Sequence, residues 1–264
     1  MSDAAWRRWA AGLGWLTAAA FLAGAALAIV ATLTHPEEPE FPPDATFVDH
    51  LLTSFEHAQA VWLADLGSSL SFAVGFAAIA ALGAVLRHVL GPDDPRGMVA
   101  VAAFMVAGAV GVAAQLIYIG GTEVATNPQY CDCGFLAEEI ISRGMIHDVI
   151  GGIVVWMIDA FVVLFAVGLL AVASVASASG SVPARWVAFT RLLAIVGLAV
   201  VAWNRIAVPL LIQAGYDDVD YFLIGSLIVG VVAGILVPIW AAWLARSLRP
   251  TESATETPPA EPAP

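Results

Sequence analysis

The chain contains no lysine, and charged residues of any kind are scarce in it. Of its 264 residues only 12% are charged, and these are 10 arginines and 22 acidic residues. Soluble domains carry about 25% charged residues, so the composition excludes an ordinary soluble domain. The shortage of basic residues also argues against a nucleic-acid partner, because phosphates need arginine and lysine contacts. With hydrophobic residues at 60%, the chain has the composition of a protein whose main partner is the lipid bilayer.

Motifs that would indicate an enzyme are missing as well. The chain has no Walker phosphate-binding loop, no HExxH metalloprotease motif and no CxxC pair. These patterns supply nucleotide contacts, metal ligands and redox thiols in many enzymes. The sequence therefore leans away from an enzyme, and its motifs predict no bound cofactor.

Long apolar runs dominate the chain. A helix needs about 20 apolar residues to cross a bilayer. Six stretches reach this length, at about residues 11–33, 59–86, 97–120, 149–175, 186–214 and 220–245. The connections between them are too short for a soluble domain, so residues 1–249 are predicted to form one all-α bundle of six transmembrane helices. Residues 250–264 are rich in Pro, Thr, Glu and Ala, a composition that predicts a disordered tail.

The arginines predict how the bundle sits in the membrane. Eight of the ten fall at the N-terminus, in the second and fourth connections and at the C-terminus: Arg7, Arg8, Arg87, Arg96, Arg185, Arg191, Arg246 and Arg249. Basic residues collect on the cytoplasmic side of membrane proteins. We therefore predict a multi-pass protein of the cell membrane with both termini and the C-terminal tail in the cytoplasm.

The acidic residues have the opposite distribution. Fourteen of the 22 lie in the connections predicted to be outside: Glu37, Glu38, Glu40, Asp44, Asp49, Glu56, Glu123, Asp132, Glu138, Glu139, Asp148, Asp217, Asp218 and Asp220. An acidic outer surface can attract cations toward a path through the protein. Adaptation to high salt would produce the same excess together with the shortage of lysine, and the sequence leaves both explanations open.

Three ionisable residues lie inside the apolar runs: Asp65, Asp159 and Arg205. Each costs about 2.5–3.5 kcal/mol near the middle of a bilayer, so such residues usually pair or line a cavity. Counted along their helices, all three lie at comparable depth in the outer half of the membrane. We expect Arg205 to contact Asp159, Asp65 or both, because a guanidinium and a carboxylate form strong hydrogen bonds. Asn204 and Gln115 are further polar candidates for the same cluster.

Pro209 is predicted to kink the helix beside this cluster. A proline inside a helix clashes with the carbonyl group four residues earlier, which here belongs to Arg205. Three roles fit the cluster: an ion pair that only sets helix register, a proton or ion relay, or a pocket for a polar ligand. The function that we favour is transport or ion translocation through this centre. A non-catalytic membrane scaffold or accessory subunit is the alternative.

A third candidate function is a metal or redox site at the outer face. Cys131 and Cys133 are the only cysteines, and His57 and His147 lie at the outer ends of the second and fourth spans. Thiolates and imidazoles together suit zinc or copper. The spacing matches no standard metal motif, so a local disulfide or free thiols with unrelated histidines remains the simpler explanation.

Small residues and tryptophans complete the pattern. Small side chains recur every four residues in three spans, at Ala20/Gly24/Ala28, Gly67/Ser71/Gly75 and Ser226/Gly230/Gly234. Such ridges allow close helix packing within one chain, and a homodimer is the alternative use of them. Six tryptophans near the cytoplasmic side are expected to anchor the bundle at the lipid headgroups: Trp6, Trp9, Trp15, Trp186, Trp240 and Trp243.

Overall fold

The computed structural model describes residues 2–36, 41–42, 44–90, 94–126, 137–215 and 221–248, with side chains except at 125–126, 137–139, 221–224 and 226. Within these ranges every regular element is a helix and no strand occurs. The all-helical prediction is therefore confirmed for the part of the chain that is described. The predicted tail at 250–264 and both cysteines lie outside the described residues.

Six helices of the described chain are long and apolar enough to cross a membrane, as predicted. The first four are α1 (Asp3–Leu33), α2 (Phe47–Leu90), α3 (Pro95–Thr126) and α4 (Ala137–Ser179). The fifth consists of α5 (Ala184–Ala202), the π-helix η2 (Trp203–Ala207) and α6 (Val208–Gln213). The sixth consists of α7 (Tyr221–Val231), the π-helix η3 (Val232–Leu236) and α8 (Val237–Leu248). This architecture is consistent with a multi-pass integral membrane protein.

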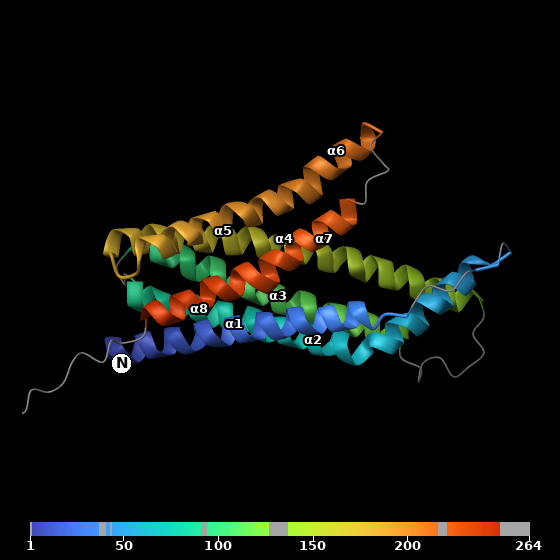
Figure 1. Cartoon of the computed structure of the whole chain (residues 1–264), viewed down its shortest axis with the longest axis horizontal. Helices are drawn as coiled ribbons and strands as arrows, with labels where there is room; N and C mark the ends of the chain where they lie inside the picture. Colours follow the sequence, from blue (N-terminus) through green and yellow to red (C-terminus); the bar gives the residue numbers. More distant parts are fainter. Residues whose placement is uncertain are drawn as a thin grey trace, which may run out of the picture.

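The two longest helices extend well past the predicted span limits. α2 has 44 residues and α4 has 43, whereas the predicted spans begin only at residues 59 and 149. At 1.5 Å per residue each helix is about 65 Å long, about twice the thickness of the hydrocarbon core. Figure 1 shows both helices running beyond α1 and α8 at the end opposite the N-terminus.

Glycines let α1, α2 and α3 pack closely. The rings of Phe72 and Phe21 lie against Gly24 and Gly75, two of the small residues in the predicted ridges. Between α2 and α3 the contact is tighter still, because a Cβ added at Gly108 would lie 2.5 Å from the carbonyl oxygen of Phe76. The ridges in the first two spans therefore serve packing within the chain. Gly230 of the third ridge has open space around it, and a homodimer stays a prediction.

Replacing Gly108 by Ala is expected to lower the free energy of unfolding by about 1–3 kcal/mol, the usual cost of overpacking. The added methyl group meets backbone and therefore cannot be accommodated by a rotamer change. Gly120 is the matched control on the same helix, since nothing lies within 4 Å of a Cβ built there. Thermal unfolding in detergent compares the two variants. Equal stability of Gly108→Ala and Gly120→Ala would contradict this packing.

The core at the end of the bundle where α1 begins holds two tryptophans that we predicted at the membrane surface. Trp186 on α5 and Trp240 on α8 are both 0% exposed. The indole Nε1 of Trp240 donates to Thr190 Oγ1 at 3.1 Å, and Nε1 of Trp186 donates to the carbonyl oxygen of Trp240 at 3.3 Å. The anchor prediction is thus wrong for these two residues, because both N–H groups find acceptors inside the bundle. Trp9, at 61% exposure, is free to act as an anchor.

Replacing Thr190 by Val is expected to destabilise the fold by about 1–2 kcal/mol, because it leaves the Trp240 N–H without its acceptor. Thr17 provides the matched control. It is equally buried, but its hydroxyl donates only to the Leu13 carbonyl oxygen of its own helix, 2.8 Å away. Thr17→Val should change stability by less than about 0.5 kcal/mol. A Thr190→Val variant that unfolds like Thr17→Val would contradict a role for this hydrogen bond.

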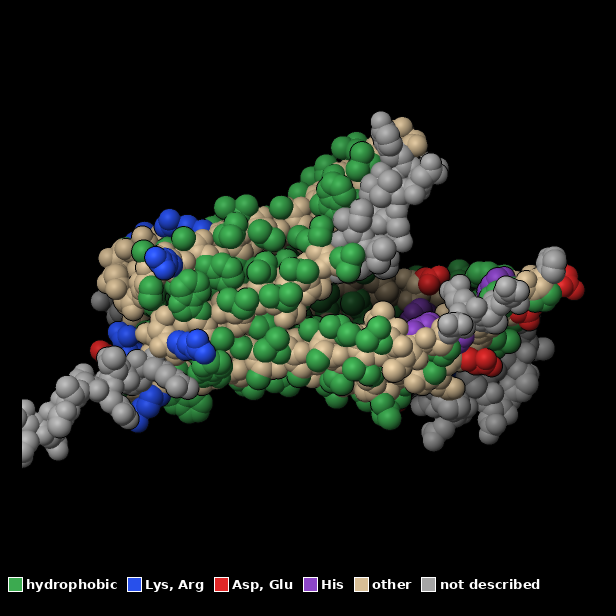
Figure 2. Space-filling view, in the orientation of Figure 1, with side chains coloured by type: hydrophobic (Ala, Val, Ile, Leu, Met, Phe, Trp, Pro, Cys, Tyr) green, Lys and Arg blue, Asp and Glu red, His purple; other side chains and the backbone are tan. Residues whose placement is uncertain are grey.

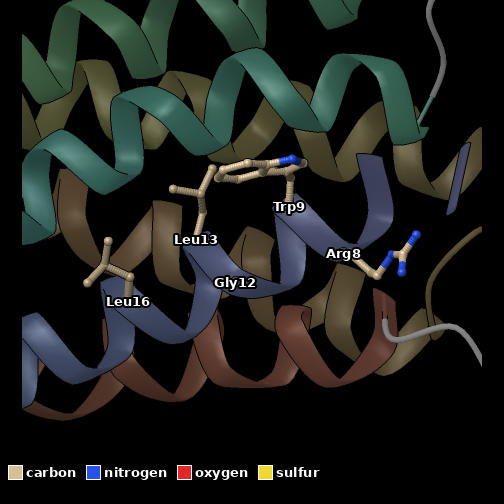
Figure 3. Close-up of a pocket in the computed structure, with 5 residues that line it drawn as sticks. All are labelled: Arg8, Trp9, Gly12, Leu13 and Leu16. Atoms are coloured by element: carbon tan, nitrogen blue, oxygen red, sulfur yellow. The ribbon is translucent and has the colours of Figure 1, made fainter. Parts of the chain in front are cut away.

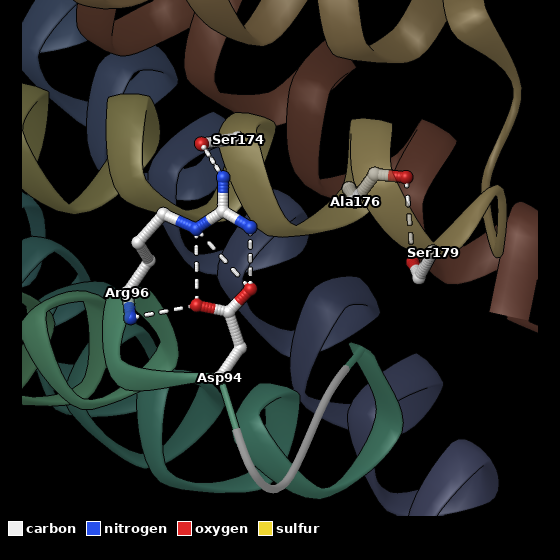
Figure 4. A network of polar contacts seen from close by, with 5 residues as sticks. All are labelled: Asp94, Arg96, Ser174, Ala176 and Ser179. Atoms are coloured by element: carbon white, nitrogen blue, oxygen red, sulfur yellow. Dashed lines mark hydrogen bonds and ion pairs between the residues drawn. The ribbon is translucent and has the colours of Figure 1, made fainter.

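The start of α3 is held to α4 by an exposed polar network (Figure 4). The backbone N–H of Arg96 donates to Asp94 Oδ1 at 2.8 Å, and its guanidinium donates to the same carboxylate and to Ser174 Oγ, also at 2.8 Å. These hydrogen bonds hold the pKa of the Asp94 carboxyl below its usual range. The resulting stabilisation is present above the unfolded pKa of about 4 and is lost as pH falls through the lowered folded value.

Charged side chains separate toward the two ends of the bundle. On the face drawn in Figure 2, arginine side chains gather at the end where α1 begins, and acidic and histidine side chains gather at the opposite end. Basic residues mark the cytoplasmic side in membrane proteins. Which end faces the cytoplasm nevertheless stays a prediction from the sequence.

The C-terminal helical hairpin packs well at one end and poorly at the other. α5 and α8 bury many side chains, among them Trp186, Trp240 and Leu244, whereas η2 and α6 bury none. Figure 1 shows α6 diverging from α1–α4, and Figure 2 shows a hollow between this diverging part and the rest of the molecule. We call η2, α6 and α7 (residues 203–213 and 221–231) the outer arm.

Candidate functional site

An ion pair joins the outer arm to the main bundle. Arg205 on η2 donates from Nε to Asp159 Oδ2 on α4. Each residue lies about 30 Å along its helix from the α4–α5 turn, at 1.5 Å per residue. That distance equals about the thickness of the hydrocarbon core, so the pair lies toward the end of the bundle away from the arginines.

The turn between α4 and α5 explains why these two residues meet. Asp159 lies 23 residues before Val182 and Arg205 lies 23 residues after it. Two antiparallel helices that leave a short turn place equidistant residues at the same height. Gly197 on α5 helps the helices approach, since a Cβ built there would lie 3.2 Å from Val162 Cγ1 on α4. Topology and a small residue therefore bring the charges together.

The guanidinium group of Arg205 is only partly satisfied. Its Cζ lies 4.0 Å from the ring centroid of Trp156, which adds a cation–π contact one helical turn before Asp159. Its Nη2 atom is buried and has no hydrogen-bond acceptor within the described ranges. The side chains of Arg205 and Asp159 are 28% and 15% exposed. The pair is therefore neither sealed in the core nor fully hydrogen-bonded.

The helix carrying Arg205 is irregular at that residue. In η2 the N–H of Val208 bonds to the carbonyl oxygen of Trp203, five residues earlier, in place of the α-helical partner. Pro209 follows at the start of α6 and has no N–H to donate to Arg205. The predicted disturbance at Pro209 is thus accommodated by a π-helix, a form that is frequent at functional sites.

The other two predicted polar residues lie near the pair in sequence or in depth but do not bond to it. Asn204 is half-buried and lies against α7, where a Cβ added at Gly225 would meet its Oδ1 atom at 2.7 Å. Gln115 is half-buried on α3, and no hydrogen bond joins it to Asp159 or Arg205, all three of which are described. Asn204 therefore packs against α7, and Gln115 is not part of the pair.

Asp65 forms a separate pair. Tyr118 on α3 donates its hydroxyl hydrogen to Asp65 Oδ2 at 3.0 Å. No ion pair links Asp65 to Arg205, although both residues are described. Comparable depth was therefore not sufficient to bring all three charges together, because Asp65 faces α3 and Arg205 faces α4.

The proposed metal site is only partly covered by the described residues. Cys131 and Cys133 lie outside them. His57 makes an edge-on ring contact with His35 at 5.2 Å, and the buried Nδ1 of His147 has no hydrogen-bond partner within the described chain. No group of three or more potential metal ligands occurs among those residues. A zinc or copper site at Cys131, Cys133, His57 and His147 stays a prediction.

Two features of the site were not predicted. Neither the hydrogen bond from Tyr118 to Asp65 nor the contact of Trp156 with Arg205 was predicted. The sequence signal for Trp156 is its place three residues before Asp159, which sets both side chains on one face of α4. The second π-helix, η3, is followed by Val237-Pro238, and η2 is followed by Val208-Pro209. A proline inside a long apolar run was a readable signal for both irregular segments.

Comparison of the chain with protein-family models, with curated proteins and with solved structures finds no match. The assignment of function therefore depends on the chemistry and geometry of the chain itself.

Proposed function

We propose that this multi-pass membrane protein translocates protons through a centre formed by Asp159 and Arg205. The observation that carries the proposal is the partly exposed and incompletely bonded pair at the base of the outer arm. Ionisable residues inside membrane helices are costly, and in transporters they form proton and ion relays.

The incomplete hydrogen bonding and partial exposure of Arg205 favour this function over a scaffold. A register-setting ion pair in a scaffold would be dry, with every donor of the guanidinium satisfied. Here Nη2 is buried without an acceptor in the described chain, and over a quarter of the side chain is exposed. Such a guanidinium retains capacity to exchange its partner, as a relay requires.

The outer arm is the element that would move during translocation. The arm begins with one π-helix, η2, at its junction with α5, and a second, η3, joins it to α8; a proline follows each, and backbone hydrogen bonds are already displaced or absent at both places. Irregular backbone at membrane depth is tolerated where it is buried in protein or lines a water-filled cavity. Movement of α6 and α7 against a fixed core of Trp186 and Trp240 would open and close the hollow beside α4.

The chemistry of one step follows from the pair. A proton that binds the Asp159 carboxylate removes its negative charge and breaks the ion pair with Arg205. The arm, no longer held to α4 by that contact, is then free to move. Release of the proton on the other side restores the carboxylate and the pair. Each group thus returns to its starting state, and one proton crosses.

Proton flux into liposomes tests the proposal. Purified protein is reconstituted into vesicles that contain the dye pyranine, and a potassium gradient with valinomycin sets the interior negative. Wild-type vesicles are expected to acidify faster than protein-free vesicles, whereas Asp159→Asn vesicles should behave like protein-free ones. Wild-type flux at the protein-free rate, with folded protein in the vesicles, would exclude proton translocation and leave the scaffold as the better function.

A further inference from the structure

The inner end of α1 carries a shallow groove that plays no part in the proposed translocation. Five residues of a single face line it, Arg8, Trp9, Gly12, Leu13 and Leu16, and it encloses about 420 Å³ (Figure 3). Trp9 is 61% exposed and Leu16 is 46% exposed. Gly12 is open as well, since nothing lies within 4 Å of a Cβ built there, whereas Leu13 is half-buried against the core. The groove is therefore open to the membrane.

The groove has one charged end and an apolar length, as a lipid molecule does. Arg8 stands at one end, and Gly12, Leu13 and Leu16 continue from it along the helix for about 12 Å, at 1.5 Å per residue. A headgroup phosphate would meet the guanidinium at the membrane boundary, and an acyl chain would lie over the small and branched residues beyond it. The exposed indole of Trp9 suits the headgroup level between the two.

The charge of this end favours an anionic headgroup. Arg8 Nε donates to the Ala4 carbonyl oxygen at 3.3 Å, and within the described chain Arg8 has no carboxylate partner. Arg7 and Arg246 lie at the same end of the bundle but do not line the groove, so Arg8 is the guanidinium that would contact the headgroup. Arginine side chains gather at the same end of the molecule in Figure 2. A zwitterionic headgroup would be attracted less strongly to this positive charge than an anionic one.

A ring contact holds the first turns of α1 in place. Trp6 stacks on the ring of His88 from the last turn of α2, with centroids 4.3 Å apart and planes 11° apart. This contact fixes the helix from which Arg8 projects, so less conformational entropy is lost when a ligand binds. The groove is thus positioned before its ligand arrives.

We propose that this groove binds one anionic glycerophospholipid from the leaflet at the arginine-rich end, with its phosphate on Arg8 and an acyl chain along Gly12, Leu13 and Leu16. The site is distinct from the Asp159–Arg205 centre. Its occupancy does not depend on whether the chain moves protons.

Native mass spectrometry tests the site. The full chain in detergent is mixed with equal amounts of phosphatidylglycerol and phosphatidylcholine that have identical acyl chains. The first bound lipid is expected to be phosphatidylglycerol by about fivefold, the effect of one cationic side chain at an anionic surface. Arg8→Gln should reduce this ratio to near one, and Gly12→Leu should lower binding of both lipids by filling the groove.

Two matched variants distinguish an effect at the groove from the general effects of removing a positive charge or adding a bulky side chain. Arg7→Gln removes a neighbouring arginine that does not line the groove, and Gly120→Leu adds the same bulk at another open glycine. Both should keep the preference. Equal losses in Arg7→Gln and Arg8→Gln, or unchanged binding in Gly12→Leu, would overturn the proposal. So would loss of a dimer peak in Gly12→Leu with lipid selectivity intact, because a second chain would then occupy the groove. Arg8 and Gly12 are both exposed, so these variants test binding and not folding.

Discussion

Replacing Asp159 by Asn is expected to destabilise the folded chain by about 2–4 kcal/mol, because it leaves Arg205 inside the bundle without its counter-ion. Arg205→Gln should cost a similar amount by leaving the carboxylate unpaired. The double variant Asp159→Asn/Arg205→Gln removes both charges and should lie within about 1 kcal/mol of the wild type, since neutral replacement of a buried pair is often nearly without cost.

The partial exposure of the pair sets the lower end of that range. Exposures of 28% and 15% let lipid headgroups or water compensate part of an unpaired charge. Thermal unfolding of the four proteins in one detergent gives the coupling energy between the two side chains directly. Asp65→Asn is the control, because Asp65 bonds to Tyr118 instead, and its effect should add to that of Arg205→Gln without coupling. A double variant as unstable as the sum of the singles would contradict the pair.

Removing the prolines after the π-helices should have opposite effects on stability and on flux. Alanine at Pro209 or Pro238 restores an N–H donor and lets the helix return to regular α geometry. The change at exposed Pro209 is expected to raise the free energy of unfolding by about 1–3 kcal/mol, up to the usual cost of a proline inside a helix. The gain at Pro238 should be smaller, because this residue is buried and alanine leaves a cavity in its place. A stiffer outer arm should lower proton flux several-fold, even though both prolines lie outside the ion pair itself.

Amide hydrogen exchange checks the physical cause of this effect. Exchange across residues 208–231 should slow in Pro209→Ala and Pro238→Ala, since opening of the outer arm becomes rarer. Pro183→Ala is the matched control, because Pro183 is exposed and precedes α5, where it interrupts no helix. It should change neither exchange nor flux. Raised stability with unaltered flux in the two test variants would mean that the arm does not move during transport.

The sequence allowed the helices to be predicted better than the contacts between them. Apolar length predicted six helices, and the depth of Asp159 and Arg205 predicted that they could meet. Depth is only one coordinate, however, and it does not determine which neighbour a side chain faces. Asp65 has a comparable depth but points to Tyr118 on α3, and a single sequence does not specify the order in which helices pack around the bundle.

The same limit explains the error over the tryptophans. The positions of Trp186 and Trp240 in the sequence predicted anchors at the lipid headgroups, yet both side chains are buried. Their indole N–H groups are bonded by the Trp240 carbonyl and by Thr190, partners that come from different helices. Burial of an indole depends on such an acceptor, and the acceptor becomes visible only once α5 and α8 are packed.

The proton flux of the double variant Asp159→Asn/Arg205→Gln tests the central claim most directly. Its fold should survive, because no charge is left unpaired, so any loss of flux reports on the chemistry of the pair. We predict that vesicles containing this stable variant acidify no faster than protein-free vesicles. Flux at the wild-type rate would contradict the account, since it would mean that the pair only sets helix register and that protons cross elsewhere.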